Sequence, residues 1–239
     1  MTSILDASTP EPDATFTYAA HPDGIVDLHF PAGGSGPLLF LIHGGFWKHL
    51  YDRLHTRPMA RAFADRGFVV ATAEYRRVGG GGGWPTTYAD IEAAYAATLH
   101  AVGDDAGIVT GHSAGGHLAL LLAAGNLPVL GAVPLAPVCD LDEAIRLDLG
   151  NGAAQAFLAG STSDGADPMR LAYDQARVTI VHGRADDEVP IGLSRGFLQR
   201  HPRVRLVEIE ADHYEPIDPD TPAFTAYADE VQAMTTPSR

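Results

Sequence analysis

The sequence contains a single cysteine, Cys139, in 239 residues. One cysteine excludes an intrachain disulfide, and it also excludes a zinc site built on a pair of thiolates. A chain without a disulfide framework fits the cytoplasm, and this is the compartment that we expect. Cys139 lies in an apolar run, where a lone thiol is expected to be part of the core.

Basic residues are also few, because 16 lysines and arginines stand against 30 acidic residues and give a formal net charge of −14. Such a charge repels phosphate backbones and anionic lipid headgroups, so we expect neither nucleic acid nor a membrane as a partner. No stretch reaches the roughly 18 unbroken apolar residues of a membrane span. The N-terminal stretch carries acidic residues where a secretory signal would carry basic ones. The expected partner is a small molecule, and the oligomeric state stays open.

Five consecutive glycines, Gly79 to Gly83, resemble a phosphate-binding loop in composition only. A P-loop requires a lysine that is absent here, and a dinucleotide-binding loop opens directly into a helix. Trp84 and Pro85 end the glycines before the helical pattern begins. We therefore expect no nucleotide site and no cofactor, and the role of the glycine loop stays open.

Apolar β-rich runs alternate with helical patterns along most of the chain. The expected strands are 25–30, 38–42, 68–75, 107–111, 130–136, 178–183 and 204–210, and the expected helices are 57–66, 87–101, 114–124, 192–200 and 221–234, with a short one at 153–160. This alternation predicts an α/β fold with a mostly parallel sheet of about seven or eight strands and helices on both faces. We expect one domain over residues 21–239, preceded by an N-terminal arm over residues 1–20.

The segment Gly111-His112-Ser113-Ala114-Gly115 matches G-x-S-x-G and lies between an expected strand and an expected helix. Turning from strand to helix in so few residues strains the central residue, and only small neighbours two positions away tolerate the turn. The strain lifts the Ser113 hydroxyl clear of the carboxyl edge of the sheet, where open α/β sheets bind ligands. It also aims the N–H of Ala114 at the group that the hydroxyl attacks. The pattern indicates a nucleophilic serine.

A serine hydroxyl near neutral pH needs an adjacent base, usually a histidine that a carboxylate orients. Both partners occur downstream, because Asp186 follows one strand in VTIVHGRADDEVP and His213 follows the last strand in VRLVEIEADHYEPIDP. The order serine, aspartate, histidine is the one expected on an α/β-hydrolase sheet.

Three other acidic residues stay open as the acid. Asp187 and Glu188 adjoin Asp186, and either would replace it if the loop register differs. Asp140 follows another strand, where some α/β-hydrolases keep their acid. Its alternative role is to cap the helix that begins near Leu141.

The segment LLFLIHGGFW offers a second source of oxyanion donors. Its glycines let backbone N–H groups approach a developing negative charge closely, and we expect those of Gly45 and Phe46 to do so. Phe46, Trp47 and Trp84 are candidates for the wall of the substrate pocket, with Trp47 favoured for its edge, and each could equally anchor its loop in the core.

Several further residues suit structural roles. His112 is expected to shape the turn around Ser113, His117 to pack with a hydrogen bond, and His43 and His182 to tie down loops. None has the spacing of a metal site. The segment Glu74-Tyr75-Arg76 is expected to be an ion pair or a loop anchor.

With HGGFW, GHSAGGHLAL, HGRADDEVP and DHYEPIDP in this order, the chain resembles the α/β-hydrolases. Within them it is similar to the HGG-type esterases and to the kynurenine formamidase (arylformamidase) group, over about residues 38 to 219. The resemblance implies a triad of Ser113, Asp186 and His213 that works without metal or organic cofactor. Relatives of the hormone-sensitive-lipase type usually carry a third glycine where this chain has Phe46, and they often add a large helical cap that is missing here.

The expected function is hydrolysis of small carboxylic esters through an acyl-enzyme intermediate on Ser113. An aryl formamide such as N-formylkynurenine is the alternative substrate. Cofactor-free perhydrolysis would use the same triad. A non-catalytic ligand-binding protein of the same fold is the alternative from another class, although such proteins often lose a triad member and this sequence offers all three.

Overall fold

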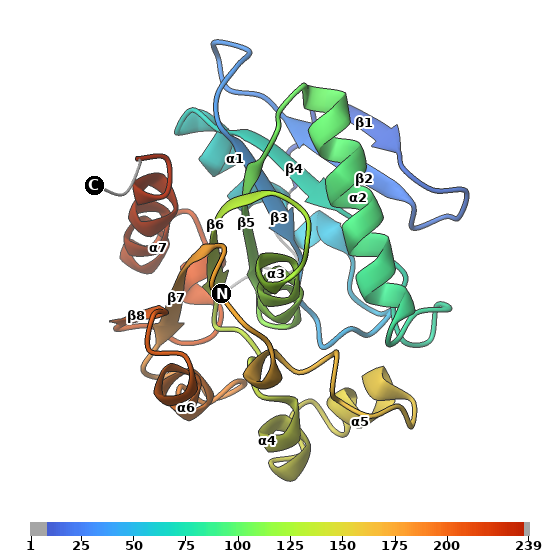
Figure 1. Cartoon of the computed structure of the whole chain (residues 1–239). Coiled ribbons are helices and arrows are strands. Elements are labelled where there is room, and N and C mark those ends of the chain that lie inside the picture. Colours follow the sequence, from blue (N-terminus) through green and yellow to red (C-terminus); the bar gives the residue numbers. More distant parts are fainter. Residues whose placement is uncertain (1–8, 237–239) are drawn as a thin grey trace.

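The computed structural model describes residues 9–236, and its centre is an eight-stranded sheet (Figure 1). The strands are β1 (Ala14–Thr17), β2 (Ile25–His29), β3 (Leu38–Ile42), β4 (Val69–Ala73), β5 (Gly107–His112), β6 (Val129–Leu135), β7 (Arg177–Gly183) and β8 (Arg205–Ile209). Their order in the sheet is β1-β2-β4-β3-β5-β6-β7-β8. The six strands from β4 to β8 along this order pair in parallel. The β1–β2 and β2–β4 pairs are antiparallel. The predicted mostly parallel sheet is confirmed.

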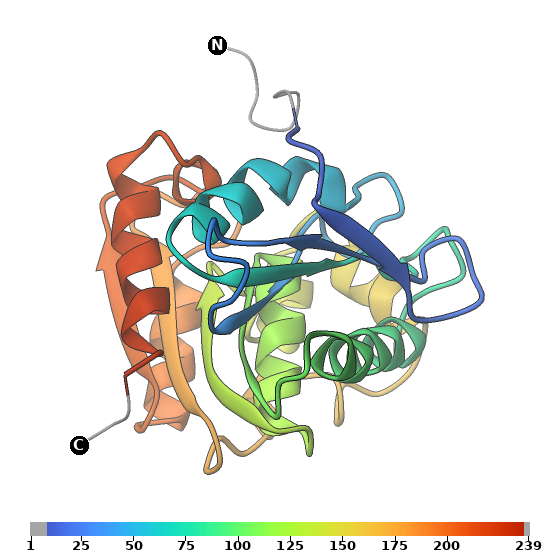
Figure 2. The ribbon, with the colours of Figure 1, turned by 90° about the horizontal axis from the view of Figure 1, so that it is seen from above.

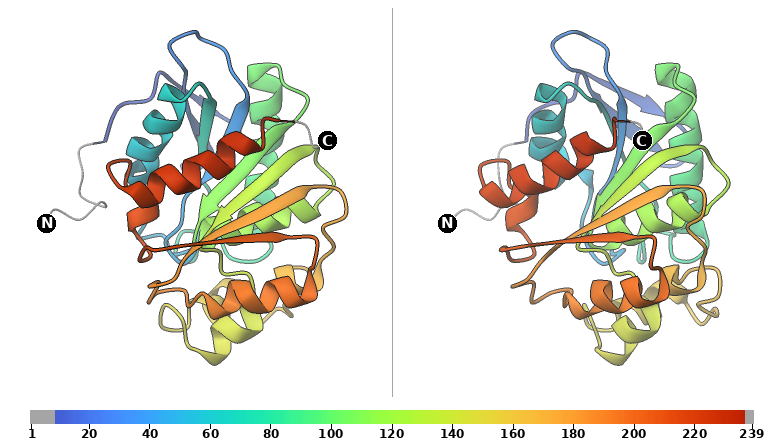
Figure 3. Two further views of the ribbon diagram at one scale, coloured as in Figure 1. Left: turned by 90° about the vertical axis from the view of Figure 1, so that its left-hand side faces the viewer. Right: turned by 60° about the vertical axis from the view of Figure 1, so that its left-hand side comes forward.

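Helices cover both faces of the sheet, as the alternating sequence pattern predicts. They are α1 (Arg57–Asp65), α2 (Thr86–Val102), α3 (Ala114–Ala124), α4 (Leu141–Arg146), α5 (Ala153–Leu158), α6 (Gly192–Arg200) and α7 (Pro222–Ala233), with 3-10 turns η2 (Arg53–Thr56), η3 (Pro168–Arg170) and η4 (Glu215–Ile217). Figures 2 and 3 show α1 and α7 on one side of the sheet and α2, α3 and α6 on the other.

Strand β3 shows why its five residues are all apolar. Leu39 and Leu41 pack in the core under α1 and α7, whereas Phe40 and Ile42 pack in the core under α2 and α3. A strand that is buried on both faces has no position for a polar side chain. The end of β3 is thereby held in the middle of the sheet, and the HGGF segment starts from this fixed point.

The expected N-terminal arm contains the first strand of the sheet. Strand β1 pairs antiparallel with β2, with Ala14 opposite Leu28 and Thr17 opposite Ile25. Residues 1–8 lie outside the described part of the chain. Three of the four residues of β1 are exposed and only Phe16 is partly buried, so this short edge strand contributes little to the core.

No large cap covers the carboxyl ends of the strands in the described part of the chain. The connection from β6 to β7 forms only the short helices α4 and α5 and the turn η3, which lie together at one end of the sheet (Figure 1). In the same part of the chain, none of the helices combines the length and the apolar character that crossing a membrane requires.

A buried ion cluster joins the N-terminal strands to α1. The Asp27 side chain is completely buried, and its Oδ2 lies 2.9 Å from Arg53 Nε and 3.0 Å from Arg57 Nη2. Its Oδ1 accepts a hydrogen bond of 2.9 Å from Thr15. Burial alone would raise the pKa of Asp27, but the bonds and charge of Arg53 outweigh it and hold the pKa below its usual value. The carboxylate therefore stays ionised inside the fold.

We predict that Asp27→Asn lowers the free energy of unfolding by about 3 kcal/mol, because two guanidinium groups lose their buried counter-charge. The pKa of Asp27 is lower in the folded state than in the unfolded state. Its contribution to the free energy of unfolding is therefore fully present above the unfolded-state pKa of about 3.9, and it is lost as the pH falls through the folded-state pKa. Urea denaturation at pH 7 and near pH 3 measures both effects.

Asp65→Asn, which removes an exposed ion pair with Arg61, is the control and should cost less than about 1 kcal/mol. Equal stabilities of the two variants at pH 7 would contradict the prediction.

Candidate active site

Ser113 occupies a strained turn between β5 and α3. Its φ is 58° and its ψ is −116°, a backbone conformation that a residue with a side chain rarely adopts. A Cβ on Gly115 would lie 2.1 Å from the carbonyl oxygen of Ile42, and one on Gly111 would lie 2.4 Å from the carbonyl oxygen of Gly115. Both positions therefore require glycine. The N–H of Ser113 donates to the Leu135 carbonyl at 2.9 Å and ties the turn to β6.

Asp186 and His213 meet across the loops that follow β7 and β8. His213 Nδ1 lies 2.7 Å from Asp186 Oδ2, and both side chains are buried. The other oxygen of Asp186 accepts hydrogen bonds from the N–H groups of Glu188 and Val189, at 3.0 and 2.8 Å. Burial would raise the pKa of Asp186, yet hydrogen bonds from His182 and His213 hold it well below its usual range. An ionised Asp186 makes His213 Nδ1 the donor and leaves Nε2 free to accept a proton.

The other acidic candidates lie elsewhere. Asp187 is exposed, and Asp140 caps α4 by accepting a hydrogen bond of 2.8 Å from the N–H of Glu143. Of the four carboxylates that the sequence offers as the acid, Asp186 is the one that contacts His213. Glu188 lines the cavity in front of Ser113 instead.

Ser113 and His213 face one cavity of about 120 Å³. Its lining residues are Gly45, Phe46, Tyr51, His55, His112, Ser113, Glu188, His213, Tyr214 and Ile217. Within residues 9–236 the Ser113 hydroxyl has no hydrogen-bond partner, so serine and imidazole share the cavity without a direct bond between them. Catalytic hydrogen bonds are often long or poorly aligned before substrate binds.

The segment after β3 wraps against the Ser113 turn. A Cβ on Gly44 would lie 2.7 Å from the carbonyl oxygen of His112 and 3.3 Å from the Cβ of Ser113, so only glycine allows this approach. The next residues, Gly45, Phe46 and Trp47, all have positive φ, at 102°, 52° and 54°. Within the described chain the N–H groups of Gly45 and Phe46 have no hydrogen-bond partner. They are therefore available to a ligand in the cavity, as the oxyanion prediction requires.

His43 and Glu74 hold this segment from behind. His43 Nε2 lies 2.9 Å from Glu74 Oε1, and the Tyr75 hydroxyl donates to the His43 carbonyl at 2.8 Å. The other oxygen of Glu74 accepts a hydrogen bond of 3.0 Å from the N–H of Arg53. Glu74 therefore anchors a loop, as the sequence indicated, and Arg76 pairs separately with Asp90.

His112 fixes the backbone of His213. Its Nε2 lies 2.9 Å from the His213 carbonyl oxygen, to which it donates, and the two rings are 4.3 Å apart. Burial, with the neighbouring His213, holds the pKa of His112 well below its usual value, so the ring stays neutral. The sequence predicted that His112 shapes the turn around Ser113. In the structure His112 also holds the loop that carries His213, the candidate base.

Trp47 and Trp84, the two candidates for the pocket wall, are not among the residues that line the Ser113 cavity. Trp47 is 1% exposed and stacks on Phe157 at 4.6 Å, with His117 against its edge at 5.1 Å. Trp84 stacks on Tyr88 at 5.9 Å. Both indoles thus anchor their loops in an aromatic cluster with α5, which is the second role that the sequence allowed.

The aromatic side chains in the cavity are Phe46, Tyr51 and Tyr214. The two tyrosines were not predicted from the sequence. Tyr214 directly follows His213, which was an available signal, whereas nothing near Tyr51 marks it as a cavity residue.

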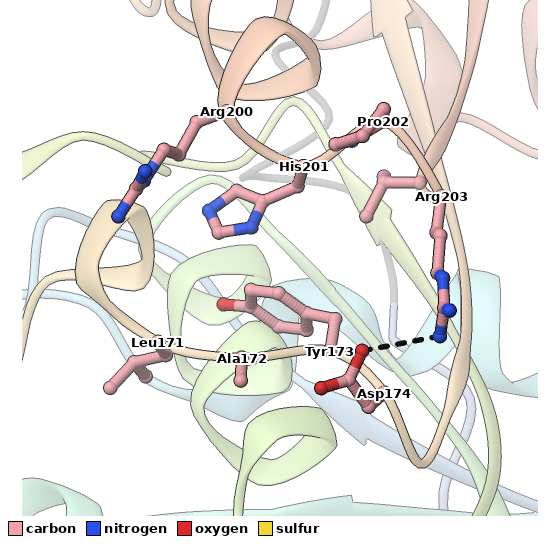
Figure 4. Close-up of a pocket in the computed structure, with 9 residues that line it drawn as sticks. Leu171, Ala172, Tyr173, Asp174, Arg200, His201, Pro202 and Arg203 are labelled. Carbon is pink, nitrogen blue, oxygen red and sulfur yellow. Dashed lines mark hydrogen bonds and ion pairs between the residues drawn. The ribbon is translucent and has the colours of Figure 1, made fainter.

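A second, larger cavity of about 340 Å³ shares no residue with the first. It lies between the loop that follows η3 and the end of α6, where Tyr173 and His201 face each other and Arg203 pairs with Asp174 at 3.2 Å (Figure 4). Because it contains neither Ser113 nor His213, a substrate bound there would not reach the candidate nucleophile.

Comparisons with known proteins agree with this architecture. The BD-FAE family model matches residues 26–129, a range that contains both the HGGF segment and the Ser113 turn. Esterase B from Lactobacillus rhamnosis, solved in an inhibited form, superposes with a TM-score of 0.78 at 20% identity, covering 96% of this chain and 90% of the esterase. Thermogutta terrifontis esterase 2, phosphoramylated by tabun, superposes with a TM-score of 0.77 at 22% identity, covering 94% of each chain. The chain thus has the α/β-hydrolase fold.

One curated relative is similar in sequence as well. It is LipM of Mycobacterium tuberculosis (strain ATCC 25618 / H37Rv), described as a probable carboxylic ester hydrolase, and it is 26% identical over 200 residues. The match covers 70% of this chain and 45% of LipM. The chain therefore spans less than half the length of this relative.

We predict that Asp186→Asn slows covalent labelling of Ser113 by a fluorophosphonate by roughly 10³- to 10⁴-fold, because an amide no longer fixes His213 in the tautomer that accepts a proton. Labelling kinetics followed by intact-protein mass spectrometry measure the effect. Asp187→Asn removes the same charge from the neighbouring exposed residue and should change the rate by less than about three-fold. A similar loss in both variants would show that Asp186 is not the acid.

Proposed function

We propose that this protein is a serine hydrolase that cleaves small carboxylic esters through an acyl-enzyme intermediate on Ser113. The observation that carries the proposal is the 2.7 Å contact between His213 Nδ1 and Asp186, with His213 and the strained Ser113 lining one cavity. An imidazole oriented by a buried carboxylate is the base that activates a serine hydroxyl.

The reaction follows from the roles of these groups. His213 Nε2 takes the proton of Ser113, and the alkoxide attacks the ester carbonyl. The N–H groups of Gly45, Phe46 and Ala114 donate to the oxyanion of the tetrahedral intermediate. His213 then protonates the leaving alcohol, and water repeats the two steps to release the acid. Asp186 orients the imidazole and stabilises its cation.

The size of the cavity supports a short acyl group. A space of about 120 Å³ has little room for a long lipid chain, and in residues 9–236 no cap extends it. The matched proteins are described as esterases or as a probable carboxylic ester hydrolase, and these descriptions support an ester as the substrate. An aryl formamide such as N-formylkynurenine would react through the same steps, so it is the comparison substrate in the test.

We predict that 4-nitrophenyl acetate and butyrate are hydrolysed with a kcat/KM about ten-fold above that of the octanoate, because the longer chain does not fit the cavity. Ser113→Ala should reduce kcat by at least about 10⁴-fold, and a fluorophosphonate should label wild type but not this variant. N-formylkynurenine is assayed in parallel. Ester hydrolysis that survives in Ser113→Ala refutes the mechanism, and a strong preference for the formamide refutes the substrate class.

A further inference from the structure

Glu188 brings an unpaired carboxylate to the wall of the Ser113 cavity. The buried acids Asp27 and Asp90 each contact a guanidinium group. Across residues 9–236, the Glu188 side chain has neither an ion-pair nor a hydrogen-bond partner. Its backbone is nevertheless fixed, because its N–H donates to Asp186 Oδ1 at 3.0 Å. The structure thus holds a free negative charge beside the candidate catalytic residues.

Among the described residues of the cavity wall, no lysine or arginine balances this charge. The histidines of the wall include His55 and His112. Burial, together with the neighbouring His43, lowers the pKa of His55 to about 4, and burial also lowers that of His112, so both rings are neutral near pH 7. The other prominent side chains are the aromatic rings of Phe46, Tyr51 and Tyr214. A carboxylate among aromatic rings is a setting that favours cations.

The position of Glu188 relates it to the leaving group. Glu188 lies two residues after Asp186, and Tyr214 directly follows His213, so the two loops that orient the imidazole also supply this wall. In the proposed reaction His213 hands its proton to the leaving alcohol. Tyr214 is 39% exposed and Glu188 is partly exposed, whereas Ser113 and His213 are buried. A leaving group that receives its proton from His213 would lie beside this open, acidic and aromatic wall.

We propose that Glu188 makes this site selective for esters whose leaving alcohol carries a positive charge, such as a quaternary ammonium group. The inference rests on the proposed esterase function and names its substrate class. The carboxylate attracts the cation in a partly desolvated place, and the aromatic rings of Tyr51 and Tyr214 line the same wall. Leaving groups that carry a carboxylate are repelled. The net charge of −14 adds a general attraction for cations.

The test compares two esters of the same shape that differ in charge alone, acetylcholine and 3,3-dimethylbutyl acetate, with acid release followed by pH-stat. Wild type should favour acetylcholine in kcat/KM by roughly ten-fold, which corresponds to about 1.4 kcal/mol. In Glu188→Gln the ratio of the two kcat/KM values should fall to between about one and two. The ratio compares two substrates on one enzyme, so partial loss of folded protein does not change it.

Asp187→Asn is the matched control, because it removes one negative charge from an exposed neighbour that does not line the cavity. It should keep the wild-type ratio to within about two-fold. An equal fall of the ratio in both variants would assign the effect to the general field of the protein and overturn the role of Glu188. An unchanged ratio in Glu188→Gln, or a wild-type preference for the uncharged ester, would overturn it as well.

A binding measurement separates this proposal from the proposed function. If wild type hydrolyses no ester, the esterase proposal fails on its own. Choline binding, titrated by NMR on wild type and Glu188→Gln, then decides the cation site. Binding that weakens at least five-fold in Glu188→Gln supports it, and equal or absent binding refutes it.

Discussion

The close contact between the Ser113 turn and the segment after β3 is the constraint on which the candidate site depends. Gly115 approaches the carbonyl oxygen of Ile42 and Gly44 approaches that of His112, so closely that a Cβ at either position would lie within 2.7 Å of it. The strained Ser113 lines the same cavity as Gly45 and Phe46. Because β3 and β5 are neighbouring, fully buried strands, the core of the sheet fixes both halves of the contact. The candidate nucleophile and the expected oxyanion donors are therefore positioned by the same packing.

Buried histidines hold the other parts of the site in place. His43 connects the segment after β3 to Glu74, and His182 lies 3.3 Å from Asp186 and donates to the Val189 carbonyl at 2.8 Å. His112 holds the carbonyl of His213. An imidazole suits this task because its two ring nitrogens can form hydrogen bonds to two different groups. His213 differs from these three histidines, because it pairs with Asp186 through Nδ1 and also lines the cavity of Ser113.

Patterns that are local in sequence predicted most of the fold and part of the site. The apolar strands, the turn around Ser113 and the loop positions of Asp186 and His213 follow from short segments whose chemistry is visible in the residues themselves. The loop register that selects Asp186 over Asp187 had to come from the structure, since the two are adjacent carboxylates. Strand β1 was missed because its exposed residues pair only with β2 and bury little apolar surface.

The pocket residues could not be predicted, because distant contacts decide them. Trp47 is next to the HGGF motif in sequence, but Phe157 and His117 bury its ring on the other side of the loop. Tyr51 reaches the cavity because a backbone turn brings it against Gly45, where a Cβ would lie 2.5 Å from the Tyr51 Cβ. Neither contact leaves a periodic or compositional signal near the residue concerned.

The cavity has two kinds of wall, and their physical properties suit different tasks. The inner wall, with Ser113, His112 and His213, is buried and fixed by backbone contacts to β6 and to its own loops. The outer wall, with Tyr51, Glu188 and Tyr214, is partly exposed and comes from loops. Stabilising a transition state requires dipoles that do not reorganise as charge develops, which the buried wall provides. Discriminating between substrates requires only a difference in affinity. Side chains of the outer wall can therefore change what the site accepts without disturbing the candidate catalytic groups of the inner wall.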